Sequence, residues 1–164
     1  MIAELYPIWN FPVGRLAIMP RPRAGDWLED EAASWRRQRI DTVVSLLEDD
    51  EIAELGLGEE AAACVKAGMR FVHFPVPDRG VPASELAVSE LIATLIEEMR
   101  QGRGVGIHCR IGVGRSASLA VCVLVALGVS IESAWSMVEQ SRGAAVPDTP
   151  AQKTWVTTWN GNCI

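Results

Sequence analysis

A cysteine and an arginine stand at opposite ends of a short glycine-bearing segment of the chain. The segment reads His108-Cys109-Arg110-Ile111-Gly112-Val113-Gly114-Arg115-Ser116. A thiolate can attack phosphorus, and the planar fork of an arginine can hold two oxygens of one phosphate group. The spacing therefore predicts a loop that wraps a phosphate, with Cys109 as the nucleophile and Arg115 as the group that holds the phosphate oxygens.

The elements on either side of this segment would place it well for such chemistry. Apolar residues 105–107 predict a strand, and the run from Ser116 to Leu127 predicts a buried helix. The free amides and the dipole at a helix N-terminus stabilise a bound anion, and with an arginine nearby they favour a thiolate at Cys109. The alternative is an ordinary strand, loop and helix with a buried cysteine.

The other residues of the segment have supporting roles in this interpretation. Gly112 and Gly114 allow the backbone to approach the phosphate, and Ser116 could donate a hydrogen bond to the sulfur. The ring of His108 could bond to the loop backbone and tune the thiolate. The predicted substrate-binding residues are Arg110, Ile111, Gly112, Val113, Gly114 and Arg115. Arg110 either faces solvent or binds an acidic group beside the phosphate.

These residues resemble the signature His-Cys-x5-Arg-Ser/Thr of the cysteine-dependent protein tyrosine phosphatase superfamily, and above all its compact dual-specificity-like and microbial members. The resemblance implies hydrolysis of phosphotyrosine in proteins, and also of phosphoserine or phosphothreonine, through a phosphocysteine intermediate. It implies no metal and no cofactor. Two alternatives stay open: a phosphatase of a non-protein phosphate ester, and a phosphate-binding or arsenate-reducing protein built on the same loop.

Two further residues fit roles that the superfamily requires. Asp78 lies in a loop rich in proline and glycine after a predicted strand, where its carboxylate could act as the general acid. By itself, its position beside Gly and Pro would favour a turn or cap residue. Gln152 lies in a C-terminal segment that resembles the one where many tyrosine phosphatases place a water-orienting glutamine. The alternative for Gln152 is a solvent-facing position in the last helix.

Composition predicts a cytoplasmic enzyme with one catalytic domain over residues 1–164. The chain has 164 residues, of which 49% are hydrophobic, and a net charge of −6, which argues against nucleic-acid or membrane partners. We expect a phosphorylated protein or peptide as partner. Cys64, Cys122 and Cys163 show neither a metal-ligand spacing nor a disulfide framework, and a reversible disulfide with Cys109 has little support.

The pattern of apolar segments predicts an α/β fold with a mainly parallel sheet of four or five strands and helices on both faces. The predicted strands are 15–19, 42–47, 70–74 and 104–109, and the predicted helices are 26–39, 59–67 and 84–101, with two or three more after the phosphate loop. The charged run 48–51 is interpreted as a solvated loop and helix start, and Arg21 and Arg23 as surface charges.

Overall fold

The computed structural model describes residues 1–9 and 14–162, so Cys163 lies outside the described residues. Its centre is a five-stranded sheet with the strand order β1-β2-β5-β3-β4. The strands are β1 (Tyr6–Trp9), β2 (Arg15–Met19), β3 (Thr42–Ser45), β4 (Arg70–His73) and β5 (Gly104–His108). β1 is antiparallel to β2, whereas β2, β5, β3 and β4 run parallel. The predicted mainly parallel sheet is confirmed.

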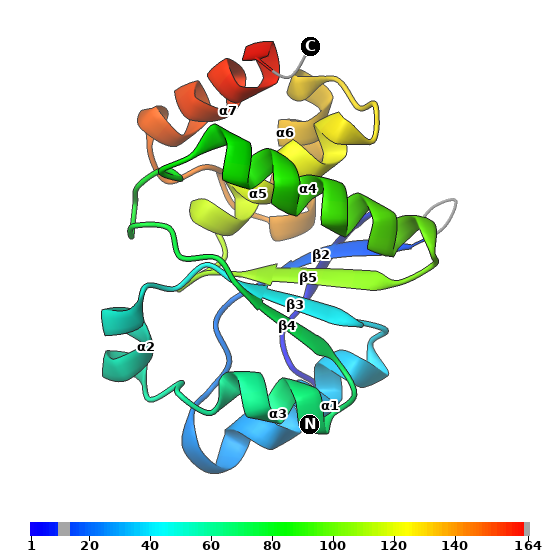
Figure 1. The fold of residues 1–164 in the computed structure, drawn as a ribbon, viewed down its shortest axis with the longest axis vertical. Helices are drawn as coiled ribbons and strands as arrows, with labels where there is room; N and C mark the ends of the chain where they lie inside the picture. The colour runs from blue at the N-terminus through cyan, green and yellow to red at the C-terminus, as the bar shows by residue number, and fades with distance from the viewer. Residues whose placement is uncertain (10–13, 163–164) are drawn as a thin grey trace.

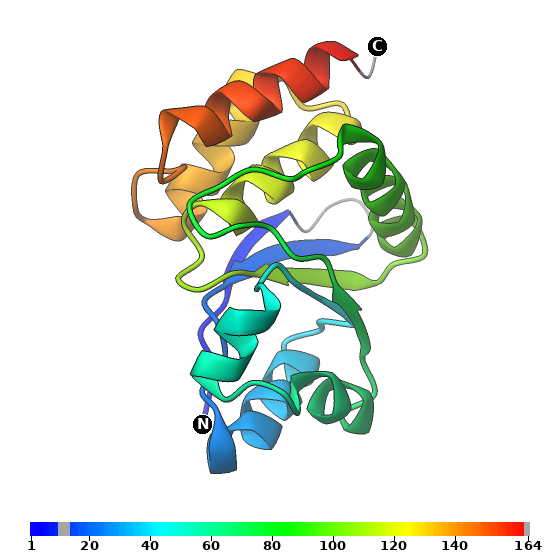
Figure 2. The ribbon, with the colours of Figure 1, turned by 60° about the vertical axis from the view of Figure 1, so that its left-hand side comes forward.

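Helices cover both faces of this sheet (Figure 1). One face carries the 3-10 turn η1 (Gly25–Trp27) and the helices α1 (Leu28–Arg37), α2 (Asp49–Leu55) and α3 (Glu60–Lys66). The other face carries α4 (Glu85–Arg100), α5 (Arg115–Ala126), α6 (Ile131–Arg142) and α7 (Pro150–Asn162). Figure 2 shows the same two layers from the side. Within residues 1–9 and 14–162, every helix is too short or too polar to cross a bilayer.

Side chains that alternate along the strands build two separate cores. In β2, Leu16 and Ile18 pack into the core beneath α4 and α5, whereas Ala17 and Met19 pack against the side of α1 and α3. All four are fully buried. Successive side chains of a strand point to opposite faces, so a strand covered on both faces is apolar at every position. This burial explains why the sequence pattern located these strands.

The edge strand β1 was not among the predicted elements. It contains Pro7, which lacks an amide hydrogen and therefore argues against the interior of a sheet. The structure pairs Pro7 with Ala17 at the outer edge, where an exposed proline is tolerated. The predicted helix 26–39 begins as the 3-10 turn η1 and continues as α1.

The carboxyl ends of the parallel strands meet at one edge of the sheet and position the candidate site. β5 ends at His108 and leads into the predicted phosphate loop, and α5 begins at Arg115. β3 ends at Ser45 and leads towards α2, while β4 ends at His73 and leads to the loop that carries Asp78. Ligands of such sheets bind at this edge.

Candidate active site

The predicted phosphate loop forms a tight turn between β5 and α5. Cys109 is buried, and its Sγ lies 3.3 Å from the Oγ of Ser116. Gly112 has a φ of +78°, and a Cβ built at this position would lie 2.9 Å from the carbonyl oxygen of Met19. Both the backbone conformation and the space therefore require glycine here. The structure brings Cys109 and Ser116 together as the sequence predicted.

Arg115 is the most heavily bonded side chain of the site. Its Nη1 and Nη2 donate to the two carboxylate oxygens of Glu51 at 2.7 and 2.9 Å, and Nη2 also donates to Asp78 at 3.0 Å. Nη1 donates further to the carbonyl of Val76 at 3.0 Å and, more weakly, to that of Leu46. These bonds fix the guanidinium next to Cys109 and leave little freedom to its plane.

The electrostatics of this pair follow from burial and charge. Burial acts to lower the pKa of Arg115, but its hydrogen bonds to Glu51 and the negative charges of Cys109, Glu51 and Asp78 together outweigh it and raise that pKa. Burial is the largest single influence on Glu51 and acts to raise its pKa, but the hydrogen bonds from Arg115, Arg110 and the Glu48 amide, together with the charge of Arg115, outweigh it and lower that pKa. Both groups are therefore charged at neutral pH, and the cation beside Cys109 is permanent.

The burial of Glu51 corrects the interpretation of the charged run 48–51 as solvated. Asp49 and Asp50 are exposed, whereas Glu48 is partly buried and Glu51 is buried. A capping box, in which Glu48 and Glu51 bond to each other's backbone amides, starts α2 and turns Glu51 inward. The three-residue spacing was a visible signal for this cap, but nothing local indicated its bond to Arg115.

Asp78 lies beside the phosphate loop, as predicted for a general acid. Its side chain is 51% exposed and pairs with Arg115 at 3.0 Å. The loop around it is shaped by a turn in which the amide of Gly80 donates to the carbonyl of Pro77 at 2.8 Å. Arg79, between them, has a φ of +56°. This turn presents the carboxylate to the cleft while leaving it accessible to solvent.

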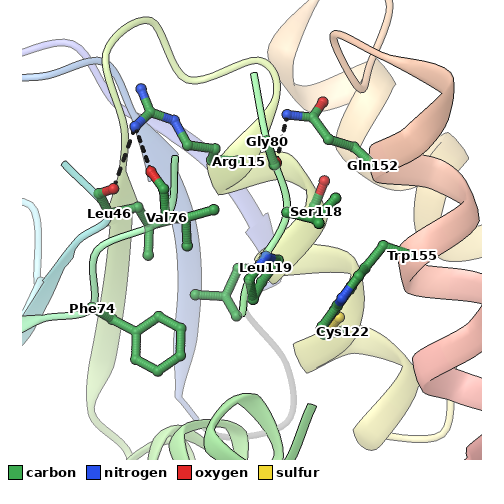
Figure 3. A pocket seen from close by; sticks show the side chains of 12 residues that line it. Leu46, Phe74, Val76, Gly80, Arg115, Ser118, Leu119, Cys122, Gln152 and Trp155 are labelled. Atoms are coloured by element: carbon green, nitrogen blue, oxygen red, sulfur yellow. Dashed lines mark hydrogen bonds between the residues drawn. The ribbon is translucent and has the colours of Figure 1, made fainter. Parts of the chain in front are cut away.

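Gln152 is buried, unlike the solvent-facing alternative, and its Nε2 would lie 2.9 Å from a Cβ built on Gly114 of the phosphate loop. Its Nε2 donates to the carbonyl of Gly80 at 3.2 Å, and its Oε1 accepts from the amide of Thr149 at 3.1 Å. Figure 3 shows the amide directed at Gly80 and the guanidinium of Arg115 directed at two backbone carbonyls. The small space that Gly80, Arg115 and Gln152 help to line has a volume of about 10 Å³, room for about one water molecule.

The open cleft is a separate space and measures about 150 Å³. It is lined by Asp78, Arg79, Cys109, Arg110, Ile111, Arg115 and Asp148. Asp148 was not a predicted site residue, yet its Oδ2 would lie 2.5 Å from a Cβ built on Gly114. The thiol, the guanidinium and two carboxylates therefore converge on one small space that can hold a phosphate group.

His108 bonds to the loop backbone as expected and has a partner that the sequence did not indicate. Its Nδ1 lies 3.2 Å from the carbonyl oxygen of Cys109, and its Nε2 lies 2.5 Å from a carboxylate oxygen of Glu60. The ring also stacks on Trp35 with centroids 6.1 Å apart. His108 and Glu60 are both buried. Because both ring nitrogens face acceptors, Glu60 fixes the orientation of the ring next to the nucleophile.

Two arginines hold the outer side of the loop. Arg110 donates to Glu54 at 3.3 Å and to Glu51 at 3.4 Å, so its charge is engaged within the protein rather than free. Arg142 was not predicted: its Nε donates to the carbonyl of Gly112 at 3.1 Å and its Nη2 to that of Ile111 at 3.2 Å. These bonds satisfy two loop carbonyls and tie the loop to the end of α6.

The fold and this site define the class: the chain is a phosphatase of the cysteine-dependent tyrosine and dual-specificity superfamily. Residues 17–129 match the family described as "Polymorphic toxin system, DSP-PTPase phosphatase", which covers more than half of the chain. The chain belongs to this family. The resemblance that the sequence showed is thereby confirmed.

Relatives of known description agree with this assignment. The mouse (Mus musculus) "Protein tyrosine phosphatase domain-containing protein 1" is 32% identical over 96 residues, 54% of this chain but only 13% of that protein. The structure of Tk-PTP in its active form is 28% identical, with a TM-score of 0.75, over 95% of this chain and 97% of that one. The structure of kinase associated phosphatase, with its catalytic cysteine replaced by serine, shares the fold with a TM-score of 0.88 at 18% identity. The match covers 99% of this chain and 96% of that one.

Proposed function

We propose that this phosphatase acts on phosphotyrosine in proteins, and also on phosphoserine or phosphothreonine, through a phosphocysteine intermediate. The observation that carries the proposal is the convergence of Cys109, Arg115 and Asp78 on one cleft. Lysines within the loop would favour a highly charged substrate such as a phosphoinositide. The variable loop positions are Arg110, Ile111 and Val113, which include no lysine, and this supports a protein substrate. Ile111 is 53% exposed beside the cleft and offers an apolar surface to an aromatic ring.

In the first step, the Cys109 thiolate attacks phosphorus and the bond from phosphorus to the ester oxygen breaks. Asp78 gives its proton to that leaving oxygen. The amides of the loop and the fork of Arg115 hold the remaining phosphate oxygens as negative charge redistributes. The products of this step are the free alcohol or phenol and a phosphocysteine.

In the second step, a water oxygen attacks phosphorus and the sulfur–phosphorus bond breaks. The Asp78 carboxylate takes the proton of this water, and the sulfur departs as a thiolate. Ser116, 3.3 Å from the sulfur, stabilises that leaving thiolate with a hydrogen bond. Gln152 remains our candidate for orienting the water, which would require its amide to leave the carbonyl of Gly80. Inorganic phosphate is the product.

The Asp78–Arg115 pair bears on how substrate enters. The carboxylate occupies an Nη2 donor of Arg115. A phosphate dianion competes for the same donor and gains the loop amides as well, so substrate binding would release Asp78 from Arg115. The freed carboxylate takes from solvent the proton that it gives to the leaving oxygen, and the attacking water of the second step returns one to it. The half-exposed side chain of Asp78 leaves it room for this movement.

The test compares wild type with Cys109→Ser and Asp78→Ala on phosphotyrosine and phosphothreonine peptides, with chelator present. We expect turnover to vanish with Cys109→Ser and to fall about 10²–10⁴-fold with Asp78→Ala, the usual contribution of a general acid. Acid quenching followed by mass spectrometry should detect phosphate on Cys109. The matched control is Asp30→Ala, which removes an exposed carboxylate on α1.

Two results would contradict the proposal. Chelator-sensitive turnover, or turnover retained in Cys109→Ser, would refute the phosphocysteine route. Turnover of p-nitrophenyl phosphate by a folded wild type that hydrolyses neither peptide would assign the site to a non-protein phosphate ester.

A further inference from the structure

A second cleft adjoins the catalytic one, on the side of the loop after β2. The parallel pairing of β2 with β5 continues past the strand ends, and the amide of Arg21 donates to the carbonyl of Arg110 at 3.2 Å. The segment 20–23 therefore runs alongside the phosphate loop. The cleft between them measures about 570 Å³, and Arg110 and Ile111 line both this cleft and the catalytic one. The two spaces are thus adjacent.

Arginines dominate the charge of this second cleft. Arg21, Arg23 and Arg110 line it together with the carboxylates of Glu4 and Glu31. Glu31 forms an ion pair with Arg23 at 2.6 Å, and Glu4 accepts a hydrogen bond from the hydroxyl of Tyr6. The lining therefore holds three arginines against two glutamates, and the charge of Arg110 is shared with Glu51 and Glu54 outside the cleft.

Arg21 differs from the other two arginines of this cleft in its bonding. Arg110 pairs with Glu51 and Glu54, and Arg23 pairs with Glu31. Within the described part of the chain, the guanidinium of Arg21 donates to the carbonyl of Pro22 at 3.1 Å and to no carboxylate. Its charge is therefore available to an anion brought by a ligand.

The catalytic cleft is too small for a whole peptide and has acidic residues on its other side. Its volume of about 150 Å³ can take the phosphate and part of the side chain that carries it. Asp78 and Asp148 line this cleft and disfavour an anionic neighbour next to them. An acidic group beside the phosphorylated residue would therefore be directed towards Arg21.

We infer that the second cleft is a substrate subsite in which Arg21 binds an anionic group next to the phosphorylated residue. This inference rests on the proposed function and narrows it to phosphopeptides that carry a flanking carboxylate or a second phosphate. Both sources share the chemistry of an oxyanion, which an arginine fork binds through charge-assisted hydrogen bonds. Exposed Ile2 and Ile111 provide apolar contacts for the peptide between the two anions.

The experiment uses three phosphotyrosine peptides that differ only in the flanking residue: glutamine, glutamate or phosphoserine. We expect wild type to favour glutamate over glutamine about tenfold in kcat/KM, the range of one charge-assisted hydrogen bond. In Arg21→Gln this ratio should fall to about one, and in Arg21→Lys it should be partly retained. The control Arg100→Gln removes an exposed arginine of α4 and should keep the wild-type ratio.

The glutamate and phosphoserine peptides distinguish the two sources. A phosphoserine preference well above that for glutamate assigns the subsite to a second phosphate, and equal preferences assign it to any anion. A wild type that does not discriminate, or a preference that survives in Arg21→Gln, would overturn the inference. The same peptides are also titrated against Cys109→Ser, so the preference is measured as Kd even if lack of turnover refutes the proposed function.

Discussion

The bond between Glu51 and Arg115 gives the sharpest test of how this site is held together. Glu51→Gln keeps the size of the side chain but removes the charge that neutralises Arg115. The side chains of Arg115 and Glu51 are 2% and 5% exposed, so the pair belongs to the buried class. Breaking a buried pair typically costs about 3–5 kcal/mol because a charge is left without compensation. In the variant, Arg115 keeps its hydrogen bonds to Asp78 and to two backbone carbonyls. We therefore expect the free energy of unfolding to fall by about 3 kcal/mol, the lower end of that range.

Urea unfolding at pH 7 measures this cost directly, with Glu54→Gln as the matched control. Glu54 has the same type of bond to Arg110, but its side chain is 67% exposed, so its loss should cost less than about 1 kcal/mol. Equal costs for the two variants would refute the argument that burial makes the Glu51 pair essential. A Glu51→Gln variant that unfolds normally but loses activity would show instead that the pair only orients Arg115.

The stability that Glu51 contributes should decrease as the pH falls, and the same urea unfolding measures this. Burial acts to raise the pKa of Glu51, but the hydrogen bonds from Arg115, Arg110 and the Glu48 amide and the charge of Arg115 together outweigh it, so the folded pKa lies below the ordinary value of 4.5. A lowered folded pKa stabilises the protein above the unfolded pKa, and this stabilisation is lost as the pH falls through the folded value. The difference between wild type and Glu51→Gln should therefore be complete at pH 7 and shrink below about pH 4.5.

Three further substitutions or modifications test the surroundings of the loop. Gly114→Ala places a Cβ 2.5 Å from the Oδ2 of Asp148, so kcat/KM should fall at least about tenfold, measured by steady-state kinetics. Arg142→Ala removes two hydrogen bonds to loop carbonyls and should cost about 1–3 kcal/mol in urea unfolding. Burial and the charge of Glu60 raise the pKa of Cys64 to about 12, so iodoacetamide at pH 8 should leave Cys64 unmodified in peptide mass mapping while Cys109 reacts.

The sequence predicted those features that depend on neighbours in the chain. The central parallel strands were visible because a strand buried on both faces is mostly apolar, as from Leu16 to Met19 of β2. Cys109, Arg115 and Ser116 were visible because one loop and one helix start bring them together. Asp78 was visible because prolines and a glycine mark its loop. The antiparallel strand β1 was not visible, because Pro7 is compatible with a strand only at an edge.

The residues that hold the loop were not predictable, because their partners lie far away in the sequence. Glu51 lies 64 positions before Arg115, and Glu60 lies 48 positions before His108. In the sequence each is an acidic residue near a helix start, which usually indicates solvent. Arg142 lies 30 positions beyond Gly112, its acceptor in the loop. Only the fold shows that these charges face inward.

The long-range contacts also explain how one short motif can form a rigid anion site. A loop with glycines at two positions has many conformations available in isolation, so its amides would not converge on a phosphate without external support. Here α2 supplies the carboxylate that fixes Arg115, and α6 supplies the guanidinium that satisfies the loop carbonyls. The sheet places the ends of the loop, but these charged side chains fix its path. The motif therefore specifies the chemistry, while residues outside it specify the geometry in which that chemistry can occur.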